Sequence, residues 1–410
     1  MSRARGLALA ALLLLPVAPA VAQDAAPPVD RFQILLMTMG PGEAVWTRFG
    51  HNAIVIIDTI AGENRVYNYG TFDFAAPGFV QRFVQGRPRY WLGVSDWQRT
   101  LAEYTHYERR VEVQELALLP VQKAELAFRL AQNAEPANRE YLYDYFRDNC
   151  STRVRDMLDQ ILGGALRRAT EGVPAEGSLR FHMARSLTND LWMYLGILTA
   201  MGPAADRPLD QWGEMFLPAK VQERVRELRV PGPDGRDVPL VVREQTVVDL
   251  DTWQVEAAPP DRRFALLGAG MVLAILIATG AIAGAAGIPG RAIAGLWAVV
   301  AGLGGVLLCY LWFLSDHVAT AGNWNLLMLS PLALGLVWPV WRARGGAATR
   351  AVGVTILALA LLGLVLAHLP GLTGQHNLGI ALLLSPPSMM LGWLGIRVSR
   401  RPAGVPPAPR

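Results

Sequence analysis

Apolar positions divide the chain at about residue 263 into a mixed part and an almost continuously apolar part. Charged residues are nearly absent from residues 264–396, where five apolar stretches can be distinguished. They cover residues 264–287, 292–314, 324–341, 351–369 and 378–396. Each is about as long as the roughly 20 residues that a helix needs to cross a bilayer core. The pattern predicts five membrane-spanning helices, because an open sheet cannot satisfy its backbone in lipid.

Residues 23–262 alternate between strand-like and helix-like patterns. "FQILLM" predicts a strand over residues 32–37, and "HNAIVIID" and "RVYNYGTF" predict a hairpin with a short loop. Residues 109–118 alternate like a further strand. Apolar spacing of three to four residues predicts helices at 79–84, 97–110, 120–134, 138–149 and 150–162. The expected fold class is α+β, followed by an all-α bundle.

The pattern of residues 170–260 is less decisive. "FHMARSLTNDLWMYLGILTAMG" fits either one long helix or two, and residues 211–228 predict a helix broken by Pro218. A turn and further strands follow. Whether this region forms a separate subdomain stays open.

The N-terminus has the pattern of a secretory signal peptide. Arg3 and Arg5 precede a short apolar run at 6–18, and Ala20-Val21-Ala22 is a small-x-small cleavage site. The apolar run is too short for a spanning anchor, so we expect cleavage before Gln23. The expected organisation is a signal peptide at 1–22, a soluble domain at 23–262, a transmembrane domain at 264–396 and a tail at 397–410.

Charge sets the expected orientation of this membrane domain. The loops after the first and third stretches and the C-terminal tail contain eight arginines, at positions Arg291, Arg342, Arg344, Arg350, Arg397, Arg400, Arg401 and Arg410. The two opposite loops contain no Lys or Arg. Positive charge favours the cytoplasmic side, which places the tail in the cytoplasm and the soluble domain in the periplasm of a bacterial inner membrane. The net charge of +4 therefore gives no argument for nucleic-acid binding.

Cys150 is the most informative residue of the soluble part. The chain has two cysteines, and Cys309 lies inside an apolar stretch, so Cys150 is expected to be unpaired in an oxidising compartment. Asn149 can cap the helix that Cys150 opens, and a helix N-terminus favours a thiolate by lowering the thiol pKa. We interpret Cys150 as a nucleophile rather than as a buried structural thiol.

A thiol nucleophile needs a general base, and three histidines are candidates. His51 follows a glycine at the start of an apolar strand, whereas His106 lies in a polar helix with the pattern of a solvated surface. His182 has no distinguishing context. Context favours His51.

Several short motifs resemble the Lnb-type lipoprotein N-acyltransferase family. "FGHNAIVI", "VYNYGTFDF", "FVQGRPRYWLG" and "YDYFRDNCSTRVRD" resemble its N-terminal periplasmic domain, and "EMFLPAKV" and "SDHVATAGNWNLLMLSPLAL" extend the likeness toward the five spans. The resemblance implies a circularly permuted, NlpC-type papain-like domain. It makes Cys150 the nucleophile and acyl carrier and His51 its base.

A papain-like site also needs a polar group that orients the imidazole. We expect it from the strand "RVYNYG", where Asn68 shares a face with His51 if the hairpin pairs residue 51 near residue 68 or 70. A slip of one residue would present Tyr67 or Tyr69 instead. The alternative for Asn68 is a polar strand residue that faces water.

The resemblance implies an acyl transfer from a membrane phospholipid, through a Cys150 thioester, to the N-terminal amine of a lipoprotein. External loop residues, Asp316, His317, Asn323, Gln375, His376 and Asn377, would then either bind head groups or act as ordinary polar loop caps. The alternative functions are a periplasmic cysteine hydrolase of cell-wall peptide or amide bonds and a non-catalytic membrane scaffold. No metal motif, no phosphate loop and no cofactor is predicted, and the sequence gives no oligomeric state.

Overall fold

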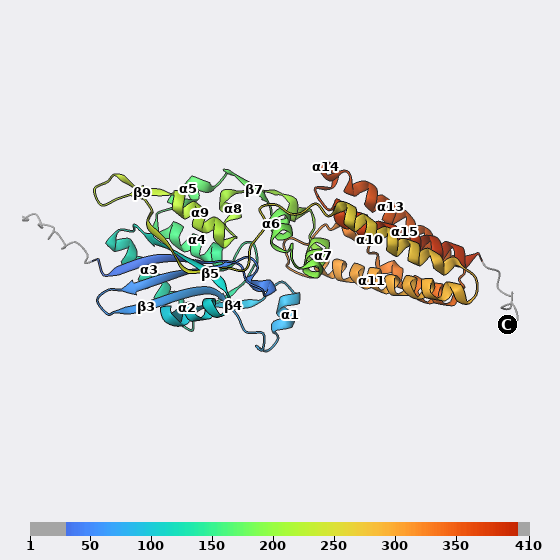
Figure 1. The fold of residues 1–410 in the computed structure, drawn as a ribbon, viewed down its shortest axis with the longest axis horizontal. Helices are drawn as coiled ribbons and strands as arrows, with labels where there is room; N and C mark the ends of the chain where they lie inside the picture. The colour runs from blue at the N-terminus through green and yellow to red at the C-terminus, as the bar shows by residue number, and fades with distance from the viewer. Residues whose placement is uncertain (1–29, 401–410) are drawn as a thin grey trace, which may run out of the picture.

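The structure is a computed structural model that describes residues 30–400. It is elongated, with a sheet-containing domain at one end and a bundle of apolar helices at the other (Figure 1). The predicted signal peptide and the last part of the predicted tail, residues 401–410, lie outside the described residues. The combination of a sheet domain with apolar helices confirms the α+β fold class.

A seven-stranded sheet forms the centre of the first domain, in the order β11-β5-β1-β2-β3-β4-β6. The strands are β1 (Phe32–Met39), β2 (His51–Asp58), β3 (Glu63–Thr71), β4 (Arg89–Asp96), β5 (Arg109–Leu116), β6 (Glu140–Leu142) and β11 (Val241–Asp251). All their pairings are antiparallel. The predicted strand at 32–37 and the predicted hairpin are both confirmed, the hairpin with Ile54 opposite Tyr67.

Helices cover both faces of this sheet. The helices of this domain are α1 (Phe79–Val84), α2 (Trp97–His106), α3 (Pro120–Asn133), α4 (Cys150–Ile161), α5 (Ala165–Thr170), α6 (Leu179–Ser186), α7 (Leu191–Ala200), α8 (Gln211–Glu214) and α9 (Pro218–Glu227), and those that cover the sheet include α2, α3, α4 and α9. Buried residues of α3, α4 and α9 share one apolar core with Ile34, Leu36 and Ile54 of the sheet. Residues of α2 pack against the opposite face, which contains Met37 and Val55. Burial of apolar surface on both faces stabilises the sheet.

The predicted helix at 138–149 is wrong. Residues 140–142 form β6, which pairs with β4, and Asp144 and Asp148 form an isolated antiparallel bridge. The side chain of Asp144 accepts hydrogen bonds from the backbone N–H groups of Phe146 and Arg147. Such local bonds from an aspartate compete with helix formation, and they produce a turn here.

Residues 170–260 contribute helices, two small ribbons and one strand of the central sheet. "FHMARSLTNDLWMYLGILTAMG" forms two helices, α6 and α7, and the side chain of Asp190 caps the second by accepting from the N–H of Met193. Pro218 begins α9 rather than interrupting a longer helix. The strands β7 (Pro174–Ser178) and β8 (Pro208–Asp210), and β9 (Arg229–Pro231) and β10 (Asp237–Pro239), form two small separate ribbons. β11 pairs with β5, so the region completes the central sheet.

Five helical segments of the second domain are long and apolar enough to cross a membrane, which confirms the predicted number of spans. They cover Arg263–Ala281, Ala285–Phe313, Trp324–Arg342, Ala347–Ala367 and Leu378–Ser399. Their main helices are α10 (Arg263–Ala278), α11 (Ile288–Phe313), α12 (Val337–Arg342), α13 (Ala347–Ala367) and α15 (Leu378–Ser399), with the short α14 (Pro370–Thr373) between the last two. The third span is irregular, because 3-10 turns at Trp324–Leu327 and Pro331–Leu336 precede its α-helix.

Buried amide side chains join the two domains. The amides of Asn323 and Asn325 both donate to the carbonyl of Thr199, at 2.8 and 2.9 Å. Gln375 donates to the carbonyl of Met201 and to Asn323 Oδ1. Since these three amides are at most 1% exposed, the joint is a packed interface.

Candidate active site

Cys150 is the first residue of α4 and is buried against the sheet. Asn149 caps this helix, since its side-chain oxygen accepts from the N–H groups of Ser151 and Thr152 at 2.9 Å each. The amide nitrogen of Asn149 donates to the carbonyl of Phe216 at 2.9 Å, which fixes the cap from outside the helix. The predicted start of the helix at Cys150 is confirmed, with the capping residue that the sequence indicated.

His51 and Asn68 lie on neighbouring strands and form a hydrogen bond, with 3.3 Å between Nε2 and Oδ1. The amide nitrogen of Asn68 donates to the carbonyl of Val66 and to the hydroxyl of Ser95. Because the nitrogen has these acceptors, the oxygen of Asn68 faces the ring and accepts from Nε2. This arrangement holds the neutral imidazole with its proton on Nε2 and leaves the lone pair on Nδ1.

The thiol of Cys150 lies next to β2 at Asn52, the residue that follows His51. The backbone N–H of Asn52 acts on the sulfur of Cys150 in the direction that lowers the pKa of the thiol, while no direct hydrogen bond between Cys150 and His51 occurs among residues 30–400. The structure thus brings His51 and Asn68 into contact and places Cys150 beside the backbone one residue further along β2. The catalytic roles of the three residues stay predictions.

Burial keeps both candidate catalytic groups neutral. His51 retains some exposed surface, but the protein around its ring lowers its pKa to about 4, chiefly by desolvation and then by the charge of Arg109. Burial raises the pKa of the Cys150 thiol. The expectation that the helix N-terminus leaves this pKa lowered is therefore wrong, since desolvation outweighs the N–H groups of Asn52 and Ser151 and the charge of Arg109.

Arg109 is the residue of this site that the sequence did not indicate. It is 5% exposed, donates to the carbonyl of Gly40 at 2.9 and 2.8 Å, and lies 4.7 Å from the centre of the Tyr104 ring. Its charge acts on both His51 and Cys150. In "ERRVEV" it has the sequence context of a surface arginine. It is also the first residue of an alternating strand, and this alternation puts its side chain on the same buried face as Val111 and Val113. The alternation is the sequence signal that could have predicted its burial.

The ring of Tyr143 and Cys150 both lie against Gly70 of β3. Gly70 has a φ of +86°, and a Cβ there would lie 3.4 Å from the Cβ of Cys150 and 3.5 Å from the ring of Tyr143. Tyr143 stacks on Tyr90 with 4.1 Å between ring centres. Burial raises the pKa of Tyr90 to about 12, so its hydroxyl stays neutral at ordinary pH. The wall beside Cys150 is therefore uncharged and largely apolar.

The other two histidines of the domain have structural surroundings. His182 is fully buried, 2.9 Å from a carboxylate oxygen of Glu214, and Arg185 donates to its other ring nitrogen at 3.1 Å. This pair ties α6 to α8. His106 ends α2 and is exposed. Neither residue approaches Cys150 through a hydrogen bond in the described part of the chain.

The loop residues that the sequence offered for head-group binding are mostly engaged in the joint. Asn323, Gln375 and Asn377 are buried and hydrogen-bonded to other loop groups. Asp316 forms an ion pair with Arg87, and the ring of His317 stacks on Tyr145. These contacts favour the interpretation of the loops as structural caps, with the exposed His376 as the exception.

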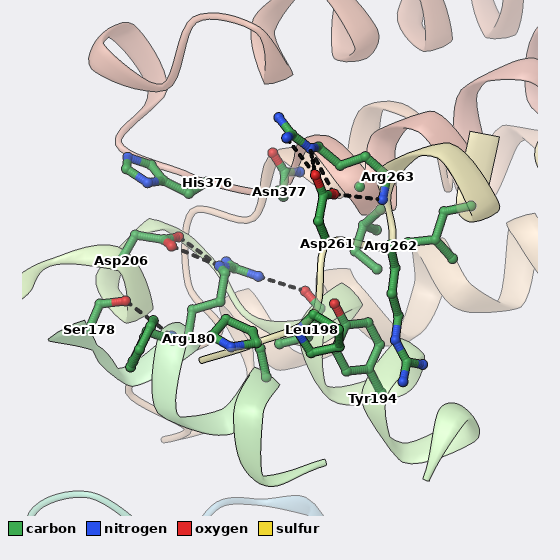
Figure 2. A pocket seen from close by; sticks show the side chains of 17 residues that line it. Ser178, Arg180, Tyr194, Leu198, Asp206, Asp261, Arg262, Arg263, His376 and Asn377 are labelled. Carbon is green, nitrogen blue, oxygen red and sulfur yellow. Dashed lines mark hydrogen bonds and ion pairs between the residues drawn. The ribbon is translucent and has the colours of Figure 1, made fainter. Parts of the chain in front are cut away.

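A cavity of about 260 Å³ lies at the joint between the domains (Figure 2). Arg180 and Asp206 form a buried ion pair on one side of it, and Asp261 and Arg263 form a second pair on the other. None of the three predicted catalytic residues lines this cavity. Within residues 30–400 no cluster of three or more His, Cys, Asp or Glu has the arrangement of a metal site.

Comparison with known proteins gives two family matches. Residues 21–188 match the Lnb N-terminal periplasmic domain, and residues 267–393 match the Lnb transmembrane domain. No curated protein and no solved structure matches the chain significantly. The two matches follow each other in the order of the two structural domains.

Proposed function

The chain belongs to the Lnb family, and from that membership and the site geometry we propose that it is a membrane-anchored cysteine acyltransferase. Cys150 is the nucleophile, His51 the general base and Asn68 the residue that orients the base. The observation that carries the proposal is the His51–Asn68 hydrogen bond, because it presents the lone pair of Nδ1 for proton transfer. The domain that bears these residues is packed onto five spans, which suits a substrate that is itself a lipid.

In the first step, Nδ1 of His51 takes the proton of the Cys150 thiol, and the sulfur attacks an ester carbonyl of a phospholipid. The carbon–sulfur bond forms as the ester carbon–oxygen bond breaks. The leaving alkoxide takes the proton back from the imidazolium, which releases a lysophospholipid and leaves an acyl thioester on Cys150. The raised pKa of the thiol and the lowered pKa of the imidazole both disfavour a thiolate–imidazolium pair in the resting site. We therefore propose that proton transfer accompanies the attack of the sulfur.

In the second step, an amine attacks the thioester carbonyl and gives its proton to His51. The carbon–nitrogen bond forms, the carbon–sulfur bond breaks, and the thiolate recovers its proton from the imidazolium. We propose that the amine is the N-terminal amine of a lipoprotein, held at the periplasmic face of a bacterial inner membrane after cleavage of the signal peptide. Both partners then reach the site from the same bilayer.

Intact mass spectrometry of the purified chain tests the proposal. After incubation with a phospholipid that contains an isotope-labelled acyl chain, we expect one labelled acyl adduct, released by neutral hydroxylamine as expected of a thioester. The Cys150→Ser variant should lack the hydroxylamine-sensitive adduct, and Cys309→Ala should retain it as the matched control. Addition of a diacylated lipoprotein should transfer the label to the acceptor. Release of free fatty acid without acceptor labelling would instead identify a hydrolase, and wild-type activity of Cys150→Ala would exclude the thioester.

A further inference from the structure

An exposed group of large apolar side chains lies around the short helix α1. It consists of Trp46, Phe74, Val80, Phe83 and Val84, which are between 42% and 68% exposed, and we call it the α1 surface. Its rings form one continuous cluster, since Trp46 packs on Phe74 at 5.1 Å and Phe74 packs on the buried Phe79 at 5.3 Å. Contiguous exposed apolar residues on a folded domain indicate a surface that binds an apolar partner.

The bundle fixes this surface at the level where a span leaves the membrane. The N–H of Asp316 donates to the carbonyl of Gln85 at 2.9 Å, and Arg87 pairs with the carboxylate of Asp316. Gly86 leaves no room for a side chain, because a Cβ there would lie 2.8 Å from the backbone nitrogen of His317. Asp316 follows α11 by three residues, and α11 ends in the exposed pair Trp312 and Phe313.

The α1 surface therefore continues the lipid-facing surface of α11. Figure 1 shows α1 on the side of the sheet domain that approaches the bundle. Aromatic side chains at such a level are typical of the interface between acyl chains and head groups. The outer leaflet of the bilayer is the occupant that this position favours.

A second cavity beside α1 has the charge that a phospholipid head group requires. It has a volume of about 300 Å³ and is lined by Ala76, Arg82, Arg89, Tyr90, Trp91 and Glu140. The buried Nε of Arg82 has no hydrogen-bond partner among the described residues. Within the described part of the chain, Arg89 pairs with one carboxylate, that of Glu140, at 3.8 Å. Two guanidinium groups against one carboxylate give the lining a net positive charge, which suits a phosphodiester, an acceptor of charge-assisted hydrogen bonds.

Aromatic rings lead from this cavity to the thiol. Phe79 of α1 stacks on Phe72, Phe72 stacks on Tyr90 at 4.8 Å, and Tyr90 stacks on Tyr143 at 4.1 Å. Tyr143 and Cys150 both lie against Gly70. Tyr90 thus belongs both to the wall of the cavity and to the aromatic chain that ends beside Cys150.

We infer that the α1 surface enters the outer leaflet and that the adjoining cavity takes the phosphodiester of a glycerophospholipid, with Arg82 and Arg89 as its ligands. An acyl chain of that lipid follows the rings of Phe72, Tyr90 and Tyr143 toward Cys150. As a statement about the acyl donor, the inference rests on the proposed function. As a statement about lipid binding, it stands on its own and is tested without catalysis.

Membrane contact is tested with a fluorescent label on the full chain in vesicles. In a Cys150→Ser, Cys309→Ala background, an NBD group is attached at Val80→Cys or at Val121→Cys. Val121 is the matched control, because it is 61% exposed in the first turn of α3. Figure 1 shows α3 in the part of the sheet domain that is far from the bundle. We expect lipids with a nitroxide on the acyl chain to quench the label at position 80 and to leave the label at position 121 unaffected. Equal quenching at the two positions would overturn the assignment of the α1 surface.

Head-group recognition is tested by native mass spectrometry of the Cys150→Ser chain with phosphatidylethanolamine and with diacylglycerol, which lacks the phosphate. Arg82→Gln should weaken phosphatidylethanolamine binding about tenfold and leave diacylglycerol binding unchanged. Arg82→Lys should restore part of the affinity, and Arg129→Gln, on the exposed face of α3, is the matched control. Equal binding of phosphatidylethanolamine by the Arg82→Gln and Arg129→Gln variants would overturn the phosphodiester site. Since Cys150 is absent from both experiments, failure of the acyl-transfer proposal leaves their results unaffected.

Discussion

The ring of His51 and the amide of Asn68 lie 3.3 Å apart on adjacent strands of one sheet. The bond acts on the ring in two ways. It selects the tautomer with a free lone pair on Nδ1, and it partly opposes the desolvation that lowers the pKa of His51 to about 4. The pH dependence of the reaction should therefore respond to the residue at position 68.

Asn68→Asp should move the acid limb of the activity profile to higher pH. In the wild type, activity requires neutral His51, so kcat/KM should fall only as the pH drops toward about 4. A carboxylate beside the ring favours the imidazolium, which raises the pKa of His51 and moves the limb upward by about 1–2 pH units. Asn64→Asp puts the same charge on an exposed position of the same strand and should leave the limb in place. An unshifted limb in Asn68→Asp would argue against His51 as the base.

Arg109→Gln should slow alkylation of Cys150 by iodoacetamide. The charge of Arg109 lowers the pKa of this thiol against the larger opposing effect of burial. Its removal raises the pKa further, so at a fixed pH near 8 the rate should fall about threefold to tenfold. Arg109→Lys should keep most of the rate, and Arg110→Gln, whose side chain pairs with Glu112 and Asp249, should keep all of it. Equal rates for the Gln and Lys variants at position 109 would show that the charge has no effect on the thiol.

Gly202→Ala should loosen the contact between Gly202 of the first domain and residues 319–321 of the second. A Cβ at Gly202 would lie 2.2 Å from the carbonyl oxygen of Ala321, and that oxygen belongs to backbone, which cannot turn aside. Hydrogen exchange should therefore speed up at the N–H of Gly202, which donates to Ala319. Gly196→Ala, in the preceding helix with no atom within 4 Å of the new Cβ, should leave exchange unchanged. Equal exchange in the two variants would contradict the packed joint.

Asp206→Ala should destabilise the protein more than a typical surface change. The carboxylate of Asp206 is 3% exposed and pairs with Arg180, whose guanidinium also donates to the carbonyls of Leu198 and Met201. Loss of the carboxylate leaves a buried cation without its counter-charge, at a cost of about 3–5 kcal/mol. Asp234→Ala removes an exposed pair with Arg236 and should cost less than about 0.5 kcal/mol. Thermal unfolding of the two variants in the same detergent measures the difference, and equal midpoints would be the contrary result.

Local patterns predicted most elements of the fold correctly. The hairpin of β2 and β3 and the helix α4 are specified by residues close together in the chain, through strand alternation and the cap of Asn149. The face shared by His51 and Asn68 follows from the same alternation. The helix predicted at 138–149 failed, because Tyr141, Tyr143 and Tyr145 recur at every second residue, as in a strand, and Asp144 binds the backbone of its own turn.

The features of the site that the sequence did not predict depend on contacts between distant segments. Arg109 acts on Cys150 through the packing of β5 beside β1 and of α4 against β2, which no local pattern records. The direction of the Cys150 pKa was wrong for the same reason, since a helix N-terminus is visible in the sequence and the depth of burial is not. The side chains of Asn323 and Gln375 looked available for ligands until the joint buried them.

The last strand of the central sheet, β11, lies beyond residues 21–188 that match the periplasmic domain of the family. A fragment that stopped at residue 188 would leave the backbone donors and acceptors of β5 without their partner strand. In the full chain β11 is the edge strand, and its three register shifts against β5 make it an irregular edge, whereas β5 pairs with β1 without such shifts. A regular free edge is a better template for pairing with another molecule, so the fragment should aggregate more readily than the full chain. The segment that leads the chain to the first apolar helix therefore also protects the central sheet from self-association.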